Sequence, residues 1–154
     1  MSAELEPYIR SELALIGVPD PDPADELHVR LVETFRRMRG SSRGSLLIAL
    51  EWVFNWDLER KSAEFARAKS DYESLLARHI VRFRDGGEKS GEMCTNRAEA
   101  LDDVAVAHLR YRLAEGVERL ARRRLDTIAH QTEVWRTEQA NERAADAFTA
   151  RQQT

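Results

Sequence analysis

The sequence has few of the residues that interrupt helices or crosslink chains. Its 154 residues include seven glycines, four prolines and a single cysteine, Cys94. One cysteine cannot build a disulfide framework within a chain, which favours a reducing compartment. The scarcity of glycine and proline argues against a many-turned β fold and favours long helices.

A long hydrophobic run is also missing. The most apolar stretch, 46–58, has 13 residues and contains Glu51, Asn55 and Asp57. Because a membrane-spanning helix needs about 20 apolar residues, this stretch predicts a buried helix instead. The printed sequence does not open with a signal-peptide pattern. We therefore expect no membrane partner and a cytoplasmic location.

Neither sign of charge dominates the chain. The 24 basic and 27 acidic residues leave a formal net charge of −3. Net charge therefore does not indicate a strongly basic nucleic-acid-binding protein, although it does not exclude a local basic patch. With 42% hydrophobic and 33% charged residues, the composition is that of a globular protein.

Hydrophobic periodicity predicts an all-α fold, because apolar residues recur every three or four positions through most of the chain. Two short helices are expected first, over 7–16 and 23–39, with a proline-rich linker between them and Asp22 as the cap of the second. The predicted division comprises an N-terminal segment, 1–44, a long helical hairpin, 45–145, and a polar tail, 146–154.

The hairpin is expected to be antiparallel and coiled-coil-like. Its first arm covers 45–84, and its second arm covers 97–145 with Asn96 as the cap. A glycine turn and a polar loop that carries Cys94 join the two arms. The apolar stripe of the second arm consists of Leu101, Val104, Leu109, Leu113, Val117, Leu120, Ile128 and Trp135.

The beginning of the first arm is apolar on nearly every side and therefore needs cover on every side. A hairpin alone buries only one seam, so we predict that further subunits supply part of the cover in a homo-oligomer. A monomeric four-helix bundle is the alternative. The residues predicted to form the oligomer or partner interface are Leu46, Leu47, Leu50, Trp52, Val53, Phe54 and Trp56.

Catalytic and metal-binding patterns are weak in this sequence. Glu88 separates Gly87 from Lys89, so the turn lacks the Gly-Lys-Ser order of a phosphate-binding loop. The paired Glu-x-x-His motifs of di-iron bundles are missing, and no histidine is fixed near Cys94 by the sequence. We therefore predict no catalytic residues, no cofactor and no metal, with a small helical enzyme as the least favoured alternative.

Positive charge is carried almost entirely by arginine, since only three lysines are present. Arginine binds phosphate through a planar fork that donates two hydrogen bonds. The hairpin would gather basic residues near its loop, where Tyr72, Phe83 and Tyr111 could stack on single-stranded bases. Acidic residues are interleaved with these arginines, so ion-paired, solvated helix faces are the alternative. The predicted nucleic-acid-binding residues are Arg78, Arg82, Arg84, Lys89, Arg97, Arg110 and Arg112.

The stretch from about Ala63 to Arg143 resembles the UvsY type of phage recombination mediator in the order of its segments. An aromatic-basic run, 82–84, precedes the glycine turn, and the acidic pair 102–103 precedes the long second helix, which carries Trp135 late in its course. The resemblance implies a helical oligomer in the host cytoplasm that binds single-stranded DNA. It would help to load a recombinase while a single-strand-binding protein is displaced.

Two functions therefore stay open. The first is a non-enzymatic accessory protein of DNA transactions, as the resemblance implies. The second is a helical interaction or scaffold module, such as a phage assembly or host-takeover factor, that does not bind DNA. Such a module would dock through the exposed flank of the 46–58 helix.

Overall fold

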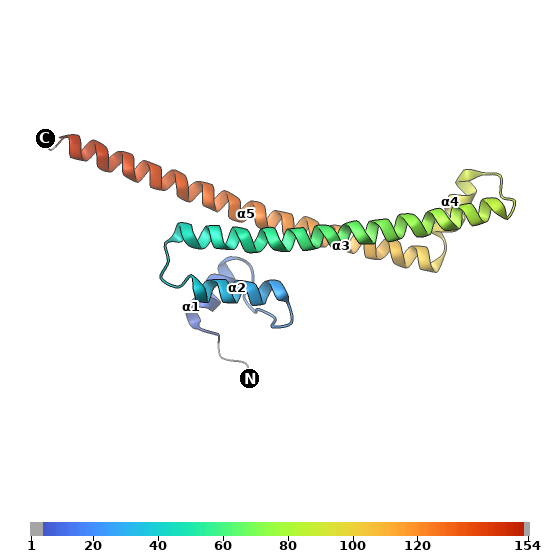
Figure 1. The fold of residues 1–154 in the computed structure, drawn as a ribbon, viewed down its shortest axis with the longest axis horizontal. Helices are drawn as coiled ribbons and strands as arrows, with labels where there is room; N and C mark the ends of the chain where they lie inside the picture. The colour runs from blue at the N-terminus through green and yellow to red at the C-terminus, as the bar shows by residue number, and fades with distance from the viewer. Residues whose placement is uncertain (1–4, 153–154) are drawn as a thin grey trace. The chain divides into compact units, whose positions relative to one another are not determined.

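The computed structural model describes residues 5–152, and all regular structure in that range is helical (Figure 1). The all-α prediction is confirmed. The elements in chain order are α1 (Pro7–Leu15), α2 (Glu26–Arg37), α3 (Arg43–Asp85), α4 (Gly91–Glu99) and α5 (Asp102–Gln152). Within residues 5–152, none of these helices combines the length and hydropathy that crossing a bilayer requires.

The chain divides into two compact units. Unit 1 consists of Met1–Asp57 with Arg123–Thr154, and unit 2 consists of Leu58–Arg122. Because α3 and α5 both run through the two units, each unit contains one part of each long helix. This division differs from the predicted one, which assigned the whole hairpin to a single segment.

The first two helices begin close to the positions that the sequence predicts. Pro7 stands in the first turn of α1, where its missing N–H costs nothing. Asp25, rather than the predicted Asp22, caps α2 by accepting a hydrogen bond from the Leu27 N–H at 2.8 Å. Asp22 instead closes the preceding turn by accepting from the Ala24 N–H at 2.8 Å.

The second arm of the hairpin is two helices rather than one. Ser90 caps α4 by accepting a hydrogen bond from the Met93 N–H at 3.3 Å, so α4 begins well before the predicted cap, Asn96. Cys94 was predicted in a polar loop, but it lies inside α4 and is fully buried. At the other end, α5 continues to Gln152, through the described part of the predicted polar tail, and every residue from 140 to 150 is exposed.

Unit 1 has the larger hydrophobic core. Its α1 and α2 cover the beginning of α3, the part that is apolar on nearly every side, and one residue of α5 joins them. Burying a single large aliphatic or aromatic side chain contributes about 1.5–3 kcal/mol. The core consists of Ile9, Leu13, Val18, Leu27, Leu31, Phe35, Leu46, Leu50, Phe54 and Ile128.

Helices α3 and α5 pack closely against each other at Gly44 in unit 1. A Cβ atom placed on Gly44 would lie 2.2 Å from the ring of Trp135. That distance is far inside van der Waals contact, so the indole occupies the space that any side chain at position 44 would need. One turn before the indole, Thr132 is also buried, and its hydroxyl donates to the Ile128 carbonyl at 3.0 Å.

Unit 2, which lies wholly within the described range, has a much smaller core. Its buried apolar residues are Cys94, Ala98, Val104 and Ala121. In place of a packed core, α3 and α5 are joined by partly exposed aromatic rings and by a hydrogen bond between His79 and Asp103. A hairpin with one short extra helix has too few elements to enclose large side chains on all sides.

Candidate interaction surfaces

The seven predicted nucleic-acid-binding residues all lie in unit 2, and all are exposed. Two of them are ion-paired: Arg97 with Glu88 at 3.5 Å and Arg112 with Glu115 at 2.6 Å. The other five have no carboxylate within 4.0 Å in the part of the chain that the structure describes. These five are Arg78, Arg82, Arg84, Lys89 and Arg110.

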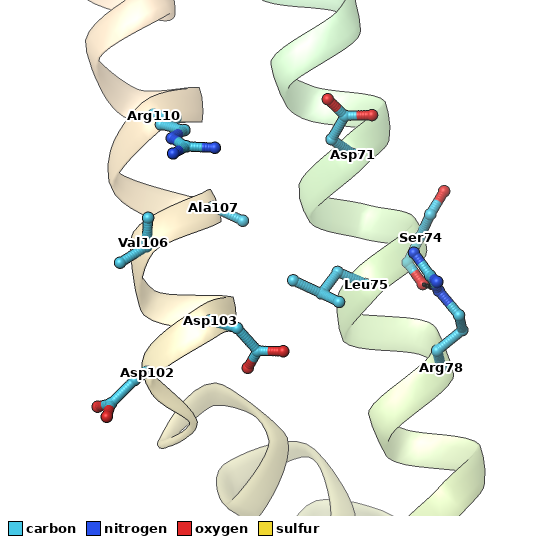
Figure 2. Close-up of a pocket in the computed structure, with 9 residues that line it drawn as sticks. All are labelled: Asp71, Ser74, Leu75, Arg78, Asp102, Asp103, Val106, Ala107 and Arg110. Carbon is cyan, nitrogen blue, oxygen red and sulfur yellow. Dashed lines mark hydrogen bonds between the residues drawn. The ribbon is translucent and has the colours of Figure 1, made fainter.

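The surface around these residues is not strongly basic. The segment 78–103 carries five basic and six acidic side chains. Figure 2 shows a pocket between α3 and α5 in which Arg110 points toward α3 and Asp71 lies opposite, with Asp102 and Asp103 at the start of α5. These carboxylates reduce the attraction of the neighbouring basic residues for a phosphate backbone.

The aromatic residues of unit 2 stack mainly on one another. The rings of Tyr72 and Tyr111 are 5.8 Å apart and nearly parallel, at 5°. His108 stacks on Tyr72 at 4.8 Å, and Phe65 stacks on Tyr111 at 5.7 Å. These intramolecular stacks occupy ring faces of both tyrosines that single-stranded bases would need.

Two ionisable groups of unit 2 have perturbed pKa values. Burial, aided by the nearby Glu99 carboxylate, raises the pKa of Tyr72 above its usual range. The His79 imidazole lies 2.9 Å from the Asp103 carboxylate, and this hydrogen bond lowers the pKa of Asp103. The second interaction joins α3 to α5.

Four of the seven predicted interface residues are buried inside the chain itself. Leu46, Leu47, Leu50 and Phe54 are only 2–6% exposed in unit 1, so their assignment to a partner surface is wrong. The prediction underestimated how much cover the short helices α1 and α2 provide. The remaining three residues, Trp52, Val53 and Trp56, lie on the outer flank of α3, where Val53 is half-buried against the core of unit 1.

That outer flank forms one side of a groove between α2 and α3 in unit 1, with a volume of about 420 Å³. Trp52 is 72% exposed, and Ile48 beside it is 43% exposed. The guanidinium of Arg30 lies 3.8 Å from the centre of the Trp56 ring, which is a cation–π contact. Arg37 also lines the groove and has no ion-pair partner among residues 5–150.

Sequence reasoning did not find the basic side of this groove. Arg30 and Arg37 are seven residues apart on α2, which places them on one helix face beside the buried apolar stripe. Helical spacing alone therefore predicts that the two arginines lie near each other. Their position opposite Ile48 and Trp52 depends on how α2 packs on α3, and periodicity does not predict that packing.

The outer face of α5 in unit 2 is a second apolar surface. Leu109, Leu113, Val117 and Leu120 of the predicted stripe point to solvent, whereas Val104 and Ile128 of the same stripe are buried. Tyr111 and Glu118 instead contact Phe65 and Ser62 of α3. The prediction that the stripe packs in the hairpin is therefore wrong for its middle part, Leu109 to Leu120. The exposed residues are Val106, Leu109, Leu113, Val117 and Leu120, which we call the α5 stripe.

Neither a metal centre nor a nucleophilic centre is evident in the described residues. Within that range, no three His, Cys, Asp or Glu side chains are grouped so that they could hold a metal ion. The buried Cys94 thiol lies 3.8 Å from the Glu88 carbonyl oxygen, a contact that suits a packed, weakly donating thiol.

No family model, curated protein or solved structure matches this chain. The resemblance to recombination mediators therefore depends on the order of sequence segments alone and stays a prediction.

Proposed function

We propose that this protein is a helical protein-interaction module that docks a partner through the groove between α2 and α3 of unit 1. The observation that carries the proposal is the exposure of Trp52, at 72%, beside a core in which other large apolar side chains are buried. Tryptophan and arginine are the residues most enriched where binding energy concentrates. An exposed indole in a groove next to two arginines fits that pattern.

The partner segment that best complements this groove is apolar and acidic. Ile48, Trp52 and Trp56 offer an apolar wall, so the partner needs at least one large aliphatic or aromatic side chain. Arg37 is available for a carboxylate, and a guanidinium donates two hydrogen bonds to a carboxylate at once. Arg30 lies over Trp56 and already pairs with Glu26 at 3.5 Å, so Arg37 is the guanidinium of the groove that a partner carboxylate would pair with.

The test is a selection of displayed random peptides on the immobilised protein. The expected result is enrichment of peptides that combine acidic and large apolar residues, with loss of their binding to the Trp52→Ala variant. Leu15→Ala is the matched control, because Leu15 is also in unit 1 and is 73% exposed outside the groove. Peptides retained equally by Trp52→Ala would contradict the proposal.

A second candidate function is a single-stranded-DNA-binding accessory protein, in the manner of a phage recombination mediator. The favouring observation is the set of five exposed basic residues in unit 2 without a carboxylate in ion-pairing range, as described above. Such a protein would assemble as a homo-oligomer and act with a recombinase or a single-strand-binding protein.

Titration of a labelled single-stranded oligonucleotide at low and moderate salt separates the two candidates. DNA binding predicts salt-sensitive affinity that the double variant Arg82→Ala and Arg84→Ala weakens, because phosphate contacts release counterions. Absence of binding at low salt, with peptide binding retained, removes the second candidate.

A further inference from the structure

Two of the three tyrosines of the chain form a stacked pair between the long helices of unit 2. The ring centres of Tyr72 on α3 and Tyr111 on α5 are 5.8 Å apart, and the ring planes are 5° from parallel. His108 stacks on Tyr72, and Phe65 stacks on Tyr111. Because offset-stacked rings attract one another, these contacts keep the two phenols side by side in the folded hairpin.

Both phenols are accessible to small oxidants from solvent. Tyr72 and Tyr111 are half-buried, and neither hydroxyl has a hydrogen-bond partner in the part of the chain that the structure describes. Since no buried side-chain oxygen in that range lacks a partner, both hydroxyls contact water. Burial and the Glu99 carboxylate raise the pKa of Tyr72, so this group stays a protonated phenol at neutral pH.

No exposed thiol of the described chain competes with these phenols for an oxidant. The only cysteine, Cys94, is fully buried in α4, and thiol oxidation follows exposure. Tyr8, the third tyrosine, is 40% exposed on α1 and stacks on no other ring among residues 5–152. The pair of Tyr72 and Tyr111 is therefore the place in the described chain where two phenols meet.

We propose that Tyr72 and Tyr111 are a modification site, at which a peroxidase acting with hydrogen peroxide joins their rings as dityrosine. Each phenol loses one electron to the oxidant and its hydroxyl proton to water, which leaves two phenoxyl radicals. A carbon–carbon bond then forms between one ortho carbon of each ring, and the two ortho hydrogens move to the oxygens to restore the phenols. In total the chain loses two hydrogen atoms, and one hydrogen peroxide is reduced to two molecules of water.

The folded hairpin favours this bond over a bond between two chains. Two groups held side by side react as a unimolecular pair, whereas coupling between chains needs a collision. The crosslink joins α3 to α5 around α4, in the unit whose buried apolar side chains are few and small. A covalent loop of this kind restricts the unfolded chain and stabilises the folded one, as a disulfide does. Neither tyrosine lines the groove of unit 1, so this proposal and the proposed function fail or succeed separately.

The test is oxidation of the full chain, in dilute solution, by a haem peroxidase with one equivalent of hydrogen peroxide. The expected product is a monomer with dityrosine fluorescence, an intact mass lower by two hydrogens, and a protease fragment that links Tyr72 to Tyr111. Oxidation of Met93, which is 44% exposed, adds oxygen and therefore raises the mass instead. The midpoint of thermal unfolding is expected to rise after crosslinking.

Tyr72→Phe and Tyr111→Phe each keep a ring in the stack and remove one phenol. Both variants are expected to lose the dityrosine fluorescence and the rise in thermal midpoint, while circular dichroism confirms that their helices are retained. Tyr8→Phe is the matched control and is expected to behave like the natural chain. The proposal is overturned if dityrosine does not form in the natural chain, forms only between chains, or forms equally in the urea-unfolded chain. Dityrosine that persists in either of the first two variants overturns it as well.

Discussion

Unit 1 and unit 2 are built from parts of the same two long helices, but they use their apolar residues differently. In unit 1, α1 and α2 cover the start of α3, and large side chains such as Phe35 and Leu31 are completely buried. In unit 2, the buried apolar residues are small, and the large ones of α5 face solvent. The comparison indicates that the short helices α1 and α2, rather than the hydrophobicity of α3 and α5, determine which apolar faces are buried in a core.

The largest expected effect comes from emptying the core of unit 1. Phe35→Ala removes a ring that is 1% exposed, and such truncations cost about 3–5 kcal/mol. We expect a lower midpoint in urea unfolding and lost hydrogen-exchange protection in α1, α2 and the start of α3. Phe148→Ala is the control, because Phe148 is 64% exposed. Equal stability of the two variants would contradict a core in unit 1.

Two glycines give opposite predictions in the two units. Gly44→Ala places a methyl group against the Trp135 ring, and such overpacking costs about 1–3 kcal/mol. Gly116→Ala meets no neighbour, so it is expected to stabilise the free protein by about 0.5–1 kcal/mol. Thermal unfolding measures both changes. A Gly44→Ala variant as stable as the natural chain would mean that the indole does not pack on α3.

A smaller effect concerns the pH dependence of unit 2. Because the hydrogen bond from His79 lowers the pKa of Asp103, this carboxylate stabilises the fold at pH values above its unfolded pKa. This stabilisation is lost as the pH falls from the pKa of the unfolded state, about 4, through the lower pKa of Asp103 in the folded state. In the Asp103→Asn variant, the midpoint of thermal unfolding is expected to decrease less as the pH is lowered through the acidic range. An unchanged profile would show that the contact contributes nothing to folding.

The smallest effects on stability are expected at the two apolar surfaces. Trp52→Ala and Leu113→Ala remove exposed side chains, so each is expected to change the free energy of unfolding by no more than about 0.5 kcal/mol. Urea unfolding of both variants checks this. A loss as large as that of Phe35→Ala would place either residue in a core rather than on an exposed surface.

The sequence predicts the helices well and their contacts only in part. Periodicity, Pro7 and the glycine turn locate four of the helical segments, because these signals act within a few residues. The cap at Ser90 and the separate helix α4 were missed, since the serine competes with Asn96 as a start signal. Which side of an amphipathic helix meets its neighbour depends on packing between distant segments.

The candidate surfaces show the same limit. Periodicity placed Leu109 and Leu113 in the seam of the hairpin, whereas the ring stacking of Tyr72 with Tyr111 turns that face outward. The apolar start of α3 was correctly identified as needing cover, but α1 and α2 supply most of it. Ile48 and Trp52 are the large apolar residues that remain exposed there, and sequence alone does not single them out.

The most direct test of the proposed docking function is a titration of the best selected peptide against the natural chain, Trp52→Ala and Leu15→Ala, followed by fluorescence anisotropy. Docking in the groove of unit 1 predicts that Trp52→Ala binds at least about tenfold more weakly. Leu15→Ala is expected to bind like the natural chain. The same affinity for all three proteins would show that the exposed indole takes no part in binding and would contradict the proposed function.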